Sequence, residues 1–191
     1  AYEPWSGAYR GNGVIKNCKR LLKYYNDPKD ATLDSTLIYV SSIIPSTFDP
    51  IKNDMISSGT IGIIKNEKLK QLLVNWSTDV IQLKEVEQMF LRYYEQNYMP
   101  YINEIGIQRN IAYTFWEQTP TMLLEYRQVI TPIPGKSKLF TKTKNELLVD
   151  TRLEGIVAWS LNLNVFNNQE SESLMKRINY ILQVLDSEIK K

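Results

Sequence analysis

The sequence predicts an all-α protein, an irregular helical bundle built around one long central helix. Apolar side chains recur every three or four residues in five separate segments of the 191-residue chain, which is the spacing of a helix with one buried face. Proline, asparagine and glycine fall between these segments, where helices begin and end. No convincing alternation of apolar and polar residues flanks a hairpin turn. We therefore expect a mostly helical single domain over residues 1–191.

The composition is that of an ordinary globular domain, with 43% hydrophobic and 23% charged residues. The net charge is only +2, so we expect no nucleic-acid partner. The sequence contains no run of about 18 apolar residues, which predicts that no membrane span lies within it. The single cysteine, Cys18, excludes an internal disulfide, and the absence of histidine removes the commonest metal ligand and general base.

Residues 1–45 are expected to hold two short helices. Residues 1–13 contain one proline and three glycines, and they predict an irregular lead-in. The apolar spacing then predicts helices over Val14–Tyr25 and Thr32–Ile43. A strand over Leu37–Ile44 is the alternative for the second segment.

A corner is predicted between residues 49 and 66. Asp49 caps a short helix that ends at Ser58, and Gly59 supplies a left-handed C-terminal cap. Three isoleucines are expected to fill the junction between this helix and the next: Ile61, Ile63 and Ile64. Asn66 then satisfies free amides at the start of the next helix. We interpret the segment as a structural corner rather than a binding site.

The strongest helical pattern covers Glu67–Tyr98 and predicts the central helix. Its apolar stripe is spaced by threes and fours and consists of Leu69, Leu72, Leu73, Trp76, Val80, Leu83, Val86, Phe90 and Tyr94. Such a stripe buries one face of an amphipathic helix. Pro100 is expected to end this helix.

Three more helices are predicted in the rest of the chain. Asn103–Phe115 is expected to be helical, and residues 131–144 form a proline- and lysine-rich loop. Asn145–Phe166 carries a further apolar stripe, which Gly155 interrupts. A turn at residues 167–168 separates it from the final helix. That helix has an almost strict heptad of apolar residues: Leu174, Ile178, Ile181, Leu185 and Ile189.

The residue types do not assemble into a recognisable catalytic or metal site. A serine triad lacks its histidine, and Cys18 has only lysines beside it, which lower a thiol pKa but do not act as its base. Four glutamates are candidates for acid–base or metal-binding roles, but they lie among lysines and arginines, as on solvated helix faces: Glu85, Glu87, Glu117 and Glu125. We therefore expect no catalytic residue, no metal and no cofactor. An enzyme that uses carboxylates alone is the weaker alternative.

Six aromatic residues form the candidate interaction site or pocket: Tyr93, Tyr94, Tyr98, Tyr101, Phe115 and Trp116. They can line a groove for a peptide or a small ligand, because such sites are rich in aromatic side chains. The other interpretation is that they pack in the core and at its rim. The lysines of the later loop are interpreted as a solvated surface, with a weak contact to an anionic surface as the alternative: Lys136, Lys138, Lys142 and Lys144.

The run Ser58-Gly59-Thr60-Ile61-Gly62-Ile63-Ile64-Lys65-Asn66 resembles the hallmark of a large bacterial family of membrane-anchored proteins, a domain of unknown function. That hallmark is a helix ending in Ser-Gly, then alternating aliphatic residues, then Ile-Lys-Asn at the start of a long helix. The match covers residues 46–100. The resemblance implies an N-terminal membrane span outside this chain and a domain on the extracytoplasmic, periplasmic side of the inner membrane. It carries over no activity, cofactor or catalytic residue.

Two functional hypotheses follow. The first is a non-enzymatic domain of a membrane-anchored bacterial envelope protein, which acts through protein–protein interaction or as a scaffold, with a protein or envelope component as its partner. The second is a domain that senses a small ligand or peptide in an aromatic pocket. An exposed apolar patch would favour the first hypothesis. A closed pocket with converging polar groups would favour the second.

Overall fold

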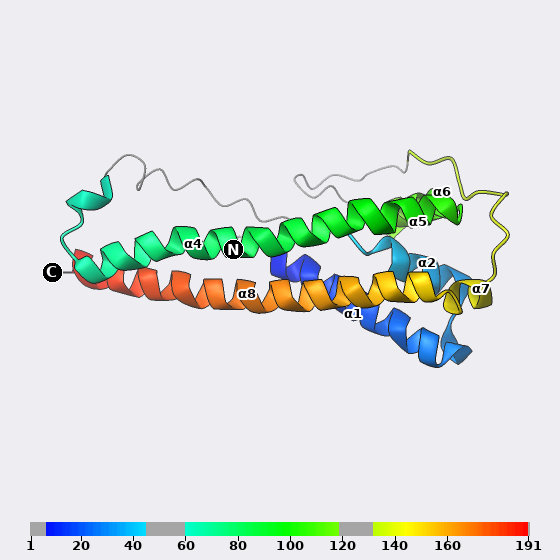
Figure 1. Cartoon of the computed structure of the whole chain (residues 1–191), viewed down its shortest axis with the longest axis horizontal. Helices are drawn as coiled ribbons and strands as arrows, with labels where there is room; N and C mark the ends of the chain where they lie inside the picture. Colours follow the sequence, from blue (N-terminus) through cyan, green and yellow to red (C-terminus); the bar gives the residue numbers. More distant parts are fainter. Residues whose placement is uncertain (1–6, 45–59, 119–131, 191) are drawn as a thin grey trace.

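Two long antiparallel helices run the length of the molecule. The computed structural model describes residues 7–44, 60–118 and 132–190. In it, α4 (Glu67–Tyr93) and α8 (Thr151–Ile189) lie side by side (Figure 1). Shorter helices gather toward one end of this pair: α1 (Gly7–Asn26), α2 (Leu33–Ser41), α5 (Met99–Glu104), α6 (Gln108–Gln118) and α7 (Lys144–Leu148). All regular elements in the described ranges are helical, so the predicted all-α bundle around a long helix is confirmed.

The final helix is longer than expected, because α8 has no break at residues 167–168 or at Gly155. Both predicted interruptions are wrong. A glycine inside a helix is less favourable than alanine by only about 1 kcal/mol, and asparagine by less, which is too little to break a helix that packs on both α1 and α4. The break lies earlier, between α7 and α8. There the Asp150 carboxylate accepts hydrogen bonds from the amides of Arg152 and Leu153 at 3.0 and 3.1 Å.

The central helical path does not end at Pro100, so that prediction is also wrong. After α4 the chain forms a five-residue π-helical turn, η3 (Tyr94–Tyr98), and continues as α5 with Pro100 in its first turn. Proline has no amide hydrogen, and in an α-helix its ring meets the carbonyl one turn earlier. The π turn is wider and closes through the hydrogen bond from the Met99 amide to the Tyr94 carbonyl. The chain therefore passes the proline without stopping.

The path ends instead at Gly106, inside the segment Asn103–Phe115 that was predicted as one helix. Gly106 has a positive φ of 74°, a conformation that residues with a Cβ resist. Its amide donates to the Asn103 carbonyl at 3.1 Å, and the next amide donates to the Ile102 carbonyl at 3.2 Å. This is the hydrogen-bond pattern of a Schellman cap, and it separates α5 from α6.

The N-terminal region is more helical than expected. Because α1 begins at Gly7, the predicted lead-in over residues 1–13 is wrong from residue 7 onward, and residues 1–6 lie outside the described ranges. Low glycine propensity is a weak local effect that packing overrides, and α1 packs against α8. The strand alternative for Leu37–Ile44 is excluded, since α2 is helical. Thr32 and Ser35 cap it reciprocally through hydrogen bonds of 3.0 Å.

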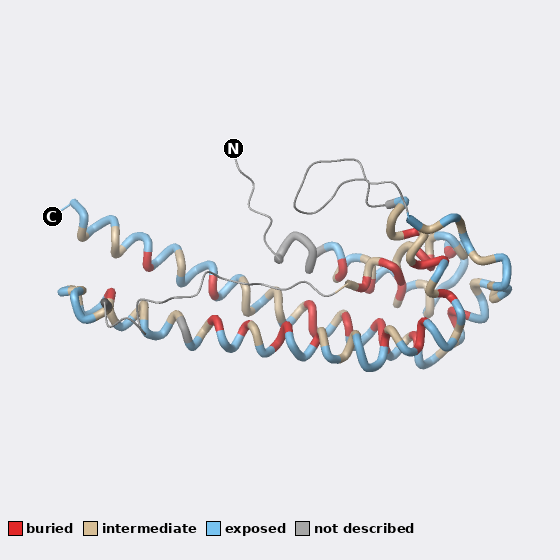
Figure 2. Tube along the Cα trace, turned by 90° about the horizontal axis from the view of Figure 1, so that it is seen from above, coloured by how far each residue is buried: buried red, intermediate tan, exposed pale blue. Residues whose placement is uncertain are grey.

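The buried side chains form two clusters of unequal size. The larger one joins α1, α2, α5, α6 and α7 to the first part of α8 and the end of α4. The smaller one contains Val80, Leu83 and Leu174, with Trp76 packed against it. Figure 2 shows the same contrast, because most buried positions lie at the end that carries the short helices. Residues 67–83 of α4 and 170–189 of α8 therefore form a two-helix projection with a thin core, which we call the arm.

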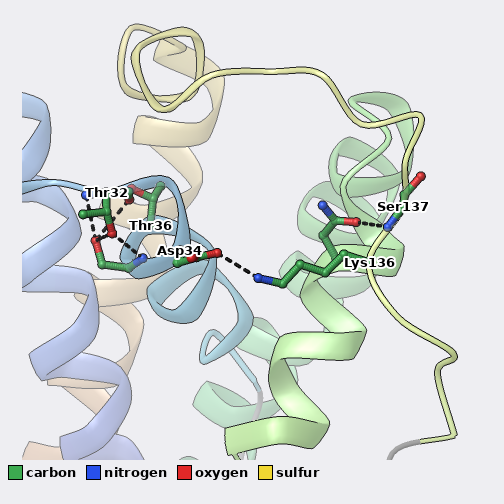
Figure 3. A network of polar contacts seen from close by, with 7 residues as sticks. Thr32, Asp34, Thr36, Lys136 and Ser137 are labelled. Carbon is green, nitrogen blue, oxygen red and sulfur yellow. Dashed lines mark hydrogen bonds and ion pairs between the residues drawn. The ribbon is translucent and has the colours of Figure 1, made fainter.

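The loop before α7 is tied to the helices by polar contacts (Figure 3). Lys136 Nζ pairs with the Asp34 carboxylate at 2.8 Å, and the Ser137 amide donates to the Asn110 side-chain oxygen at 2.8 Å. Lys144 Nζ donates to a carbonyl of the turn before α2 at 2.7 Å. Lys136 and Lys144, two lysines of the predicted proline- and lysine-rich loop, therefore bind other parts of the chain.

Candidate functional site

The predicted corner motif is described only in its second half. Asp49, Ser58 and Gly59 lie outside the described residues. The helix cap that was predicted at Asn66 is confirmed, because its Oδ1 accepts a hydrogen bond from the Leu69 amide at 3.0 Å. This cap orients the first turn of α4.

The isoleucines of the corner do not act as a group. They belong to a short 3₁₀ turn, η2 (Thr60–Ile63), and the residue after it. Because a 3₁₀ helix completes a turn in three residues, Ile61 and Ile64 share one side and are half-buried. Ile63 points elsewhere and is 76% exposed. The prediction that Ile63 fills the helix junction is therefore wrong.

Four of the six predicted aromatic residues meet at one hollow of about 200 Å³. They are Tyr94, Tyr98, Phe115 and Trp116, and the other lining residues are Ser41, Ile44, Met99, Gln108, Ile111 and Ala112. The hollow lies where η3 and α5 pass the end of α2 and the length of α6. The fold thus brings together the two aromatic groups that the sequence places in separate segments.

The remaining two aromatic residues lie elsewhere. Tyr93 packs against Trp159 of α8 with ring centroids 5.9 Å apart. Tyr101 is buried, and its hydroxyl donates a short hydrogen bond to the Asp150 carboxylate. The Arg152 guanidinium lies over the Tyr101 ring at 4.9 Å. Tyr101 therefore ties α5 to the start of α8.

A stacked pair of tyrosines forms one wall of the hollow. The rings of Tyr94 and Tyr98 lie 4.8 Å apart, with an angle of 16° between their planes. The Tyr98 hydroxyl donates to the Val40 carbonyl at 2.9 Å, which fixes the inner ring. Burial raises the pKa of both tyrosines. The wall is therefore neutral and flat, and Phe115 and Trp116 face each other edge to face beside it at 5.6 Å.

Gln108 is a polar residue of the hollow that was not identified from the sequence. It begins α6 and lines the hollow. Its Oε1 atom is buried, and no donor among the described residues reaches it. A buried acceptor without a donor is unfavourable by roughly 1–3 kcal/mol. The helix break at Gly106 is the signal that would have placed Gln108 at the start of a helix beside these rings.

The arm carries a second candidate surface, a row of exposed apolar side chains. Met175, Leu182 and Ile189 follow one another at seven-residue intervals along α8 and are 50%, 52% and 81% exposed. Ile81 of α4 is 58% exposed. We call these four residues the arm face. Of the predicted heptad of α8, Leu174 and Ile181 are buried in the neighbouring stripe, Ile178 and Leu185 are half-buried, and Ile189 belongs to the arm face.

The arm face lies opposite the polar side of the arm. On the polar side, Arg177 of α8 pairs with Asp79 of α4. Successive residues of a helix are about 100° apart, so Met175 and Ile81 each lie about 160° from the ion-paired residue of their own helix. In an antiparallel pair this rotation carries both side chains to the same side. The exposed apolar residues of the two helices therefore form one surface.

The titratable groups of the described residues serve packing and capping. Cys18 is fully buried, and burial raises its thiol pKa to about 12, so the thiolate is scarce. Burial alone would raise the pKa of Asp150, but hydrogen bonds from Tyr101 and from the Leu153 and Arg152 amides outweigh it and hold the pKa below its ordinary value. In the described part of the chain, no three His, Cys, Asp or Glu side chains gather closely enough to hold a metal ion.

No helix of the described ranges is long and apolar enough to cross a membrane. The chain matches no family model, and it shows no detectable similarity to a curated protein or to a solved structure. The resemblance to the membrane-anchored family therefore stays a prediction.

Proposed function

We propose that this protein is a non-enzymatic interaction domain whose arm face binds an amphipathic helix of a partner protein. The observation that supports this most strongly is the row of exposed apolar residues along α8, on a projection with a thin core of its own. Scattered exposed apolar residues are ordinary, but a contiguous row indicates a contact surface. Covering such side chains stabilises a complex by removing apolar area from water.

The seven-residue spacing favours a helical partner. The half-buried Ile178 and Leu185 lie between the exposed Met175, Leu182 and Ile189. Together these five residues of α8 follow one another at alternating intervals of three and four, which is the pattern of a coiled-coil seam. In the adjacent stripe Leu174 and Ile181 are buried, and Leu174 packs against Val80 and Leu83 of α4. Two neighbouring apolar stripes are typical of a helix that has two helical neighbours in a bundle.

The available chemistry supports a role without catalysis. The chain has no histidine, and the buried Cys18 is not poised as a nucleophile. Asp150 and Tyr101 bind each other and a helix end. Paired or strongly perturbed acids in a cleft, the usual sign of acid–base catalysis, are not found at either candidate surface of the described residues.

We further propose that the partner lies at the bacterial envelope. The support is the resemblance of residues 58–66 to the family of membrane-anchored proteins. The full-length protein is then held by an N-terminal span, with this domain on the periplasmic side. Alkaline phosphatase fused to its C-terminus should be active in that topology, and an inactive fusion beside a bright cytoplasmic fluorescent fusion would contradict it.

Two lysine substitutions at adjacent positions test the interaction. Leu182→Lys puts a charge on the arm face, and Gln183→Lys puts the same charge on an exposed neighbour about 100° around the helix. Each variant of the full-length protein is used to capture partners from its source cells. We expect the amount of a specific partner to fall about tenfold with Leu182→Lys and to remain with Gln183→Lys. Both variants should keep the circular dichroism of the wild type, and equal capture by the two would contradict the proposal.

A further inference from the structure

We propose that the aromatic hollow binds a small, neutral, flat aromatic molecule that carries an N–H donor, of which indole is the simplest example. This goes beyond the interaction role, because the residues that line the hollow belong to η3, the short helices and the segment after α2, and not to the arm. The size of the hollow, the absence of charge among the described residues that line it and the unsatisfied oxygen of Gln108 each point to this class of ligand.

The size of the hollow suits a small molecule with two fused rings. An apolar cavity of about 150 Å³ takes up benzene, and the hollow measures about 200 Å³. Sites for larger organic ligands occupy roughly 300–1,000 Å³. The stacked Tyr94 and Tyr98 give a flat surface against which a ring can lie, and aromatic rings favour offset stacking or edge contacts with such neighbours.

The lining excludes charged ligands. None of the ten described residues that line the hollow is acidic or basic. An ion moved from water into such a site loses its hydration and gains no counter-charge, which is strongly unfavourable. Nucleotides, carboxylates and amines are therefore poor candidates.

Gln108 selects for the donor. Its Oε1 is buried and has no donor among the described residues, so a ligand in the hollow pairs with it only when the Gln108 side chain turns toward the ligand. The neighbouring Tyr98 hydroxyl already donates its hydrogen to Val40. A ligand N–H that reaches Oε1 satisfies a buried acceptor, whereas a ring of the same shape without a donor leaves it unsatisfied. Sites built around such a hydrogen bond reject analogues that lack it.

Indole and benzofuran provide a matched pair of probes, since they share a fused-ring shape and differ in N–H against oxygen. Titration calorimetry with the purified chain should give a Kd for indole of about 0.1–1 mM, a reasonable range for a ligand of this size. We expect benzofuran to bind at least about fivefold more weakly, which is the loss of one hydrogen bond.

Three variants locate the effect. Gln108→Leu removes the acceptor at similar volume and should abolish the preference for indole while benzofuran still binds. Ala112→Leu fills the hollow and should abolish binding of both rings. Gln88→Leu lies on an exposed part of α4 and should change neither. Thermal unfolding of each variant shows whether it is folded, and if Ala112→Leu is not, the Gln108→Leu result decides.

The proposal is overturned by any of three results. These are a lack of saturation by indole up to its solubility limit, equal binding of the two rings to the wild type, and a preference for indole that survives in folded Gln108→Leu. None of these results bears on the arm face, so the two proposals fail independently.

Discussion

At the start of α8, one carboxylate joins several parts of the chain. Asp150 accepts hydrogen bonds from two amides of its own helix and from the Tyr101 hydroxyl of α5. Arg152 lies over the same tyrosine ring and pairs with Glu104 at 2.6 Å. Because Tyr101 is buried, loss of the carboxylate leaves a helix uncapped and a hydroxyl without its acceptor. This cluster holds α5 against the longest helix.

Replacement of Asp150 should therefore be costly. We expect Asp150→Ala to lower the free energy of unfolding by roughly 2–3 kcal/mol, the sum of a lost cap and a lost hydrogen bond to a charged group. Asp150→Asn should lose less, because asparagine is also a good cap. Urea unfolding at pH 7 measures both. Indistinguishable midpoints for wild type and Asp150→Ala would refute the role of the cluster.

The same carboxylate predicts a dependence on pH. The pKa of Asp150 is below its ordinary value in the folded chain, so its contribution to stability is fully present above the unfolded pKa of about 3.9. It is lost as the pH falls through the lower folded value, where the protonated group accepts these bonds poorly. Acid unfolding should therefore be less steep below about pH 4 in Asp150→Asn than in the wild type. Identical acid profiles would contradict the depressed pKa.

Two glycines should respond in opposite ways to the same substitution. Gly106 has positive φ, whereas Gly155 lies in the interior of α8, and neither has an atom within 4 Å of the position that a Cβ would take. Gly106→Ala should destabilise by about 1–2 kcal/mol through backbone strain. Gly155→Ala should stabilise by up to about 1 kcal/mol through helix propensity. Thermal melts test the pair, and shifts of the same sign would show that one of the conformations is wrong.

At the scale of elements, apolar spacing predicted the helices better than their ends. The cap at Asn66 was predictable because it depends on an amide only three residues away. The predicted stops at Pro100 and at residues 167–168 were wrong because packing and a π turn outweigh local propensity. The stop at Gly106 was missed because glycines at many turns look alike in sequence, and only its backbone conformation distinguishes it.

The thin core of the arm predicts uneven stability along α8. Residues 170–189 pack mainly on α4 through the smaller cluster, whereas residues 151–163 also pack in the larger one. Local opening requires less free energy where fewer apolar contacts are lost. Amides of the arm should exchange hydrogen at least about tenfold faster than those of residues 151–163. Uniform protection along α8, measured by exchange mass spectrometry, would contradict the division into arm and main core.

The whole molecule is elongated because its two longest helices lie together. At 1.5 Å per residue, the 39 residues of α8 span about 58 Å. A compact globule of this chain length has a radius of gyration of about 16 Å. Small-angle X-ray scattering should give a clearly larger value, and a value at the compact limit would mean that the arm does not project.

Both candidate surfaces depend on tertiary contacts that cannot be read from the sequence. The aromatic residues were identified as a set, but Tyr93 and Tyr101 look no different in sequence from Tyr94 and Tyr98. Gln108 gained meaning only when the fold placed it beside those rings. On the arm, the predicted heptad left out Met175 and Leu182 and did not separate the buried Leu174 from the exposed Ile189, because that division depends on how α8 packs against α4.

We propose that the protein contacts its partner through the arm face. A photoreactive amino acid introduced into the full-length protein in its source cells tests it directly, at Met175, Leu182 and Ile189 and at the residue after each: Lys176, Gln183 and Lys190. We predict a cross-linked product of one defined mass from the three apolar positions and little from their neighbours, following the seven-residue repeat. A product of twice the chain mass would identify a second copy as the partner. Products without that repeat, or none at all, would contradict the account.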